Sequence, residues 1–319
     1  MSPAAEFICD PSMVKHVPVL LGEVLDALSP KASGRYLDCT FGGGGHTRAL
    51  LEAANETEVT SLDCDPDAVS RAESLKLDYG KRFRFVDTNF SRLDEVVGGP
   101  FDGVLFDLGL SSFQLGEAGK GFSFRLDAPI DMRYDSRSGM AASEFLETAT
   151  RASLTRAVRD YGEERRWKRV VNVILEARGT GRLSRTQSAA KLVEQAIGGT
   201  RSRIHPATKT FQGIRIAING ELESLALALP QAFGQLRKGG VLAVISFHSL
   251  EDRITKRFFR RMAGRPEHRG DSTSVQERKC FAKMLKTKAI KPSSGEVDLN
   301  PRSRSARLRA ITKLSEPQL

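Results

Sequence analysis

The chain has 319 residues, 40% of them hydrophobic and 28% charged, with a formal net charge of +10 at pH 7. This length suffices for one large domain or two ordinary ones, and the four cysteines form no Cys-x-x-Cys pair, which argues against a disulfide framework and a zinc knuckle. Since no apolar run approaches membrane-spanning length and no signal-type leader is visible, we expect a cytoplasmic protein.

The first third of the chain alternates predicted strands and helices. Helices are predicted at residues 46–54 and 66–75, where Pro66 stands at a position that the first turn of a helix tolerates. Short apolar runs predict strands at residues 35–41, 58–65, 82–90 and 101–109. This alternation predicts a parallel sheet with helices on both faces.

The alternation stops after residue 112. Apolar residues at helical spacing predict helical segments within residues 152–177 and a helix over 185–199, which two glycines end. A single amphipathic helix over residues 211–229 and a strand at 239–247 then resume the α/β pattern.

We therefore expect a Rossmann-like α/β domain interrupted by a helical insertion. Residues 1–112 and 206–319 would form the α/β domain, with a last strand near residues 306–314. Residues 113–205 would form an inserted helical domain that recognises the substrate.

Four consecutive glycines, residues 42–45 in "LDCTFGGGGHT", fall at the first strand–helix turn, where parallel α/β sheets bind ligands. The dinucleotide pattern Gly-x-Gly-x-x-Gly fails at Thr47 and at Arg48, and no Gly-Lys-Ser/Thr phosphate loop follows. The turn thus favours S-adenosylmethionine over a nicotinamide dinucleotide, although a purely structural tight turn remains an alternative. Asp63 closes the second predicted strand, where a carboxylate can accept hydrogen bonds from ribose hydroxyls.

The positive charge is concentrated in the last fifth of the chain. Residues 253–319 hold 18 Lys and Arg against 6 Asp and Glu, whereas the first 252 residues hold 31 against 33. Such a segment is either solvated surface or a footprint for nucleic acid, and charge alone leaves both readings open.

Several longer blocks carry a family resemblance, in one order and across nearly the whole chain. They are "HVPVLLGEVL", "LDCTFGGGGHT", "LDCDP", "FDLGLSSFQL", "KGFSF", "PIDMRYD", "YGEER", "HPATKTFQGIRIAINGEL", "ISFHSLEDR" and "NPRSRSARLR". The chain resembles the bacterial ribosomal RNA small subunit methyltransferase H family. The resemblance implies an S-adenosylmethionine-dependent enzyme that methylates N4 of a cytidine in the decoding region of 16S ribosomal RNA. The chain departs from the family pattern at Gly116, Lys120, Gly213 and Gly220.

The resemblance implies cofactor contacts at Gly44, Gly45, His46, Asp63, Phe90, Asp107 and Gln114. The two glycines would let the methionine moiety approach the backbone, and His46 begins a helix whose N-terminal amides face a carboxylate. Phe90 follows the third strand, where an apolar wall beside adenine is expected. Gln114 rests on the resemblance alone.

The expected chemistry needs no metal. The lone pair of cytosine N4 is delocalised into the ring, so a group that accepts an N4–H would help to localise it, and positioning for in-line transfer supplies much of the rest. We expect Asp107 or Ser111 to be that acceptor. Ser249 with Asp252 matches a helix capping box, a structural role.

The expected partner is 16S ribosomal RNA within the small subunit, with no membrane involved. The basic tail and residues 161–169 would meet RNA phosphates and a splayed-out base, with Trp167 in the core. Two alternatives remain: the same chemistry on another RNA or DNA amino group, and a non-catalytic ribosome-assembly protein that binds RNA. Intact glycines, Asp63 and Asp107 argue against the second.

Overall fold

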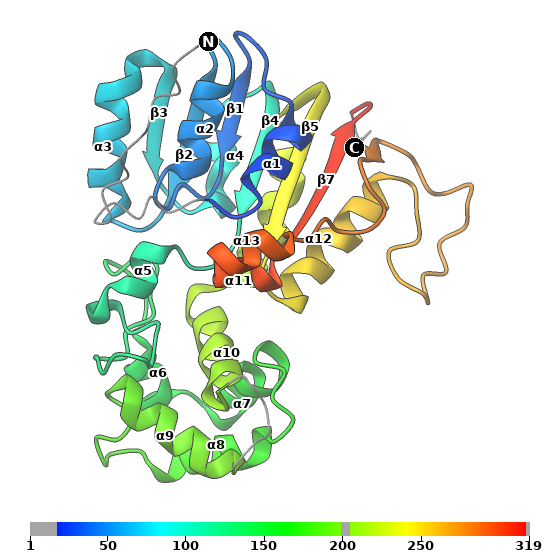
Figure 1. Cartoon of the computed structure of the whole chain (residues 1–319). Coiled ribbons are helices and arrows are strands. Elements are labelled where there is room, and N and C mark those ends of the chain that lie inside the picture. The colour runs from blue at the N-terminus through cyan, green and yellow to red at the C-terminus, as the bar shows by residue number, and fades with distance from the viewer. Residues whose placement is uncertain (1–17, 199–204, 317–319) are drawn as a thin grey trace.

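The computed structural model describes residues 18–198 and 205–316 and contains a seven-stranded sheet with the order β3-β2-β1-β4-β5-β7-β6 (Figure 1). The strands are β1 (Arg35–Asp38), β2 (Glu58–Asp63), β3 (Phe83–Asp87), β4 (Phe101–Asp107), β5 (Leu236–Ser246), β6 (Ala282–Met284) and β7 (Arg307–Lys313). The first five run parallel, and β7 is antiparallel to both β5 and β6. This sheet confirms the predicted Rossmann-like fold, with its switch point between β1 and β4.

The central strands are buried on both faces, as their near-continuous apolar runs require. Along β4, Leu105 belongs to one hydrophobic core, while Val104 and Phe106 belong to the other, because successive side chains of a strand point to opposite faces. The register places Leu105 opposite Ala243 of β5, and Ala243 opposite Ala310 of β7.

Helices cover both faces of the sheet (Figure 1). The first core contains residues of α1 (Leu21–Leu28), α2 (Gly45–Ala53) and α3 (Ala68–Tyr79). The second core contains residues of α4 (Leu93–Val96), α11 (Glu221–Gly234) and α12 (Ser249–Met262).

A third hydrophobic cluster is built from the helices that lie between β4 and β5 in the sequence (Figure 1). These helices are α6 (Ala142–Thr148), α7 (Arg151–Thr155), α8 (Trp167–Glu176), α9 (Thr186–Ile197) and α10 (Ala207–Asn219). Because Phe211 and Ile214 of α10 are buried in this cluster, we propose that the helical unit extends to the end of α10 rather than to residue 205.

Glycines divide two helical stretches, and the single helix predicted over residues 211–229 is wrong. Residues 152–177, where helical segments are predicted, form α7, a π-helical turn (Arg156–Tyr161) and α8. A Cβ at Gly162 would lie 2.5 Å from the Lys209 carbonyl, and one at Gly213 would overlap the Ala157 carbonyl, so this turn packs on α10 backbone to backbone. The predicted helix over residues 211–229 is divided at Gly220, whose φ of 57° is left-handed and ends α10.

The region after α12 is mostly irregular, as expected, apart from β6 and the short helix α13 (Ser294–Leu299). The strand predicted near residues 306–314 is confirmed as β7. Within the two described ranges, no helix combines the length and apolar character that crossing a membrane requires.

Candidate active site

A cavity of about 560 Å³ lies where the parallel strands end. Its wall comes from the turns that follow β1 to β5, and it reaches Tyr134 of the helical unit and Arg302 near the C-terminus. It brings together all the site residues that the sequence predicts: Gly44, Gly45, His46, Asp63, Phe90, Asp107, Ser111 and Gln114. The expected position, beyond the carboxyl ends of the strands, is therefore observed.

Asp63 fixes the glycine turn. Its Oδ2 accepts the Gly42 N–H at 2.7 Å, and its Oδ1 accepts the Asp65 N–H at 2.9 Å. Burial raises the pKa of Asp63 to about 6, although these two backbone N–H groups act in the opposite direction. Each carboxylate oxygen carries two lone pairs, so a ribose hydroxyl can still donate to it.

The glycines are required first by the protein itself. Gly42 and Gly44 have φ values of 53° and 76°, in the left-handed region. A Cβ at Gly44 would lie 2.9 Å from the Phe41 ring, and one at Gly45 would lie 2.5 Å from Pro18. Tight turning and close packing thus account for these residues, and contact with the methionine moiety stays a prediction.

His46 and Asp107 form the polar floor of the cavity. His46 Nε2 lies 3.4 Å from Asp107 Oδ2, close enough for an ion pair but without the alignment of a hydrogen bond. Burial lowers the pKa of His46, but the Asp107 carboxylate outweighs it, so the pKa is raised. Among the described residues, neither ring nitrogen of His46 nor Asp107 Oδ1 has a hydrogen-bond partner, although all three atoms are buried. Unsatisfied polar atoms in two residues that line the cavity fit a polar ligand.

Ser111 and Gln114 are engaged with each other. Ser111 Oγ accepts the Gln114 N–H at 3.1 Å, and Gln114 Oε1 accepts the Ser111 N–H at 3.0 Å, which makes a capping box at the start of α5 (Ser112–Gly116). The Ser-x-x-Gln spacing could have predicted this box. Ser111 therefore has a structural role beside any catalytic one.

The predicted capping box of Ser249 and Asp252 is wrong by one residue. His248 is the N-cap of α12, and Glu251 Oε2 accepts the backbone N–H groups of Phe247 and His248. Asp252 instead pairs with Arg307 and Arg309 of β7, at 3.1 and 2.7 Å. Asp252 and its arginine partners are more than 50 residues apart in the sequence, so no local pattern could predict their pairing.

Further lining residues were missed at the end of the cavity that faces the helical unit. Tyr134 and Phe247 supply aromatic surface, and Glu221 and Glu251 supply carboxylates. Ligand atoms of Glu221, His248 and Glu251 lie within 4.8 Å of one another, a spacing that could hold a metal ion. However, Arg215 donates to both oxygens of Glu221 at 2.8 Å, so its charge is already paired.

Residues suited to each part of S-adenosylmethionine surround the cavity. Asp63 offers an acceptor for ribose, and Phe90, which packs edge-on against Phe106, offers aromatic surface. His46, which directly follows the glycine turn, and Asp107 carry polar atoms without a partner among the described residues. Together with the strand order, this site fits a Rossmann-like methyltransferase that uses S-adenosylmethionine.

The sequence profile of the MraW methylase family matches residues 13–314, and this chain belongs to that family. A protein of Rickettsia typhi named Ribosomal RNA small subunit methyltransferase H is 44% identical over 304 residues, which cover 94% of this chain and 98% of that protein. Its namesake in Rickettsia rickettsii (strain Sheila Smith) is 45% identical over 306 residues, covering 94% and 99%. A solved rRNA methylase from Streptococcus thermophilus has a TM-score of 0.44 at 11% identity, over 95% of this chain and 99% of that one.

Proposed function

We propose that this enzyme transfers the methyl group of S-adenosylmethionine to N4 of a cytidine in the decoding region of 16S ribosomal RNA. The observation that carries the chemistry is that Asp107 lines the cavity and that its Oδ1 has no hydrogen-bond partner among the described residues. The relatives' name, ribosomal RNA small subunit methyltransferase H, supports the substrate class.

In this mechanism Asp107 is the acceptor for N4. S-adenosylmethionine, when bound, supplies a methyl group on a positively charged sulfur. Asp107 Oδ1 accepts an N4–H, which localises the nitrogen lone pair toward that methyl group, and it takes the proton as the N4–carbon bond forms and the sulfur–carbon bond breaks. His46 lies 3.4 Å from the other carboxylate oxygen and orients the carboxylate toward the base.

Ser111 is the weaker candidate for this role. Its hydroxyl oxygen already caps α5, whereas Asp107 Oδ1 can accept a donor from the substrate without giving up another bond to the described residues. The hydroxyl retains a second lone pair, so Ser111 can assist as a second acceptor near the base.

The target base must leave its stack to reach a carboxylate inside the cavity. Tyr134 of the helical unit and Phe247, which follows β5, give the cavity aromatic surface that suits the face of a pyrimidine. Trp167, by contrast, is partly buried against the helical core, as the sequence predicts.

Two arginines of "NPRSRSARLR" are suited to RNA phosphates. Arg302 lines the cavity, Arg302 and Arg304 are exposed, and neither forms an ion pair within residues 18–198 and 205–316. Arg307 and Arg309 of the same run are paired with Asp252 instead. We propose that the first pair guides the RNA strand at the cavity mouth, because phosphate contacts position a nucleic acid.

The decisive experiment incubates the purified enzyme and labelled S-adenosylmethionine with small subunits that lack the modification, with free 16S RNA and with DNA, and then maps the label. We expect label on N4 of one cytidine in the decoding region. Label at another position, or on DNA, would overturn the proposed substrate. Cofactor binding without any transfer would favour a non-catalytic assembly protein.

A further inference from the structure

The segment that follows β4 covers one side of the cavity. It comprises α5 and a 3-10 turn (Ala118–Lys120), and Phe113 and Gln114 from this segment line the cavity. A Cβ at Gly43 would lie 2.5 Å from the Phe113 ring, so this ring lies directly on the glycine turn. The position of the covering segment therefore decides how closed the cofactor side of the cavity is.

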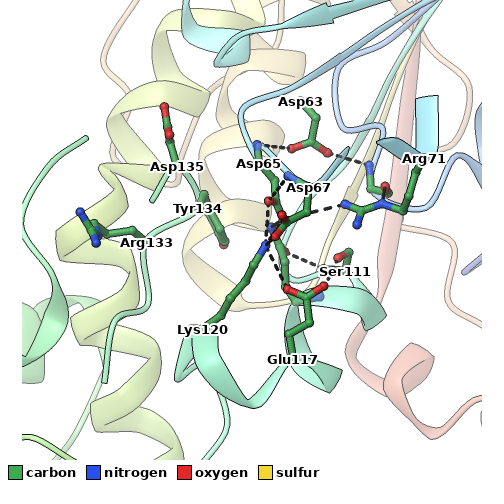
Figure 2. A network of polar contacts seen from close by, with 12 residues as sticks. Asp63, Asp65, Asp67, Arg71, Ser111, Glu117, Lys120, Arg133, Tyr134 and Asp135 are labelled. Carbon is green, nitrogen blue, oxygen red and sulfur yellow. Dashed lines mark hydrogen bonds and ion pairs between the residues drawn. The ribbon is translucent and has the colours of Figure 1, made fainter. Parts of the chain in front are cut away.

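This covering segment is attached to the sheet through Asp65, which follows β2 and is 1% exposed (Figure 2). Lys120 Nζ donates to both carboxylate oxygens of Asp65, at 2.7 and 2.8 Å. Gln114 Nε2 donates to Asp65 Oδ2 at 3.0 Å. A buried carboxylate is tolerated only with such partners, so the covering segment and the β2 turn stabilise each other.

The surrounding charges strengthen the same attachment (Figure 2). Lys120 also lies 2.5 Å from Asp67 and 3.4 Å from Glu117. Arg71, whose guanidinium lies 4.8 Å from the centre of the Phe113 ring, donates from Nε to the Gly42 carbonyl at 2.9 Å. Contacts from α3, the β2 turn and the covering segment thus meet around one carboxylate.

We propose that Asp65 is a positioning residue for cofactor binding: through Lys120 and Gln114 it holds the covering segment against the glycine turn and so retains the bound cofactor. Asp65 does not line the cavity, so it acts through these two residues and not on the reacting atoms. The cofactor part of this inference rests on S-adenosylmethionine binding alone, and only its turnover part rests on the proposed function.

The test measures dissociation of S-adenosylmethionine by stopped flow, beside KM for the cofactor, kcat and thermal stability. We expect Asp65→Asn and Lys120→Met each to speed dissociation about tenfold and to raise KM similarly, with kcat at saturation changed less than about threefold. The double variant should resemble either single variant, because both remove the same attachment. In contrast to Lys120→Met, Lys120→Arg should keep dissociation slow, since arginine has the same charge and a side chain of similar length.

Glu117→Gln is the matched control, because Glu117 is exposed and contacts the same lysine only at 3.4 Å. We expect its dissociation rate to stay within about twofold of wild type. Unchanged dissociation in Lys120→Met with a lower melting temperature, or additive effects in the double variant, would reduce Asp65 to a structural residue. If Asp65→Asn does not fold, Lys120→Met still decides, since Lys120 is partly exposed. If the proposed RNA substrate proves wrong, the measured dissociation of S-adenosylmethionine still tests this inference.

Discussion

The carboxyl ends of β2 and β4 present two kinds of carboxylate to one region of the molecule. After β2, both oxygens of Asp63 and both oxygens of Asp65 accept hydrogen bonds from the chain itself. At the end of β4, Asp107 Oδ1 and both nitrogens of His46 have no such partner among the described residues. Hydrogen bonds from the chain hold Asp63 and Asp65 in place, and Asp63 keeps spare lone pairs for a ligand, whereas Asp107 Oδ1 depends on a ligand for any partner.

The largest expected effect is at β4. Asp107→Asn should lower the single-turnover rate by about 100-fold or more, the lower range for loss of a proton acceptor in a transition state. Cofactor affinity should fall by a smaller factor, because Asp107 is also an expected cofactor contact. Rapid-quench transfer from labelled S-adenosylmethionine to small subunits measures the rate, and calorimetry measures the affinity.

Asp102→Asn provides the matched control, because Asp102 lies at the opposite end of the same strand. It accepts the Arg35 N–H at 2.9 Å and pairs with Lys31 and Arg237, at 2.7 and 3.0 Å. This variant should lower the melting temperature and leave turnover unchanged. A near-normal single-turnover rate for Asp107→Asn would show that the Asp107 carboxylate is not the acceptor for N4.

A smaller effect is expected at the β2 end. Asp63→Ala should weaken S-adenosylmethionine binding by about 1–3 kcal/mol, the scale of hydrogen bonds to a charged acceptor. Calorimetry measures this affinity. Asp87→Ala is the control: Asp87 lies beside Asp63 in the sheet register but pairs with Arg137 outside the cavity. Wild-type affinity in Asp63→Ala would remove the ribose contact.

The ionisation of Asp63 gives a second test of its contact with the cofactor. With its pKa raised from 3.8 to about 6, the unliganded protein loses stability from this group as pH rises from about 4 to 6. Ribose hydroxyls favour the ionised form, so cofactor binding should strengthen as pH rises through this window. We expect about tenfold weaker binding near pH 5 than at about pH 7.5, because about a tenth of the groups is then ionised. A pH series by calorimetry checks this, and the dependence should vanish in Asp63→Asn.

The parts of this molecule that the sequence predicts correctly are those with local causes. Strand–turn–helix alternation predicts the parallel sheet, and the end of β4 brings Asp107 to the cavity without further information. The break at Gly162 depends on close approach to α10, and the attachment of Lys120 to Asp65 spans 55 residues. Neither leaves a local pattern. Whether a carboxylate is satisfied is likewise a property of the folded chain.

Ser111 has a hydrogen bond within the chain and is also a candidate acceptor for the substrate, so its substitution tests the structural and the catalytic role separately. Ser111→Ala should cost about 1 kcal/mol of stability through loss of the α5 cap. It should lower turnover less than tenfold, with cofactor affinity nearly unchanged. Thr150→Ala removes the comparable cap of α7, away from the cavity, and should cost stability alone. Unaltered single-turnover rates for Ser111→Ala would remove Ser111 as an assisting acceptor.

The smallest effects on activity are expected in the basic C-terminal segment, where Arg307 and Arg309 form ion pairs and Arg302 and Arg304 form none with the described residues. Arg302→Gln with Arg304→Gln should lower RNA affinity, and the slope of log affinity against log salt should shrink by roughly 0.7 to 0.9 for each phosphate that the protein no longer neutralises. Cofactor affinity should not move. Charge reversal at Lys283, Lys286 and Lys288, all exposed around β6, tests the other RNA path. If only this triple variant lowers the slope, the strand runs along the β6 edge and not past the cavity mouth. If neither variant does, the search moves to Arg165, Lys168 and Arg169, which are exposed on the helical unit, and the contrast between paired and unpaired arginines loses its functional meaning.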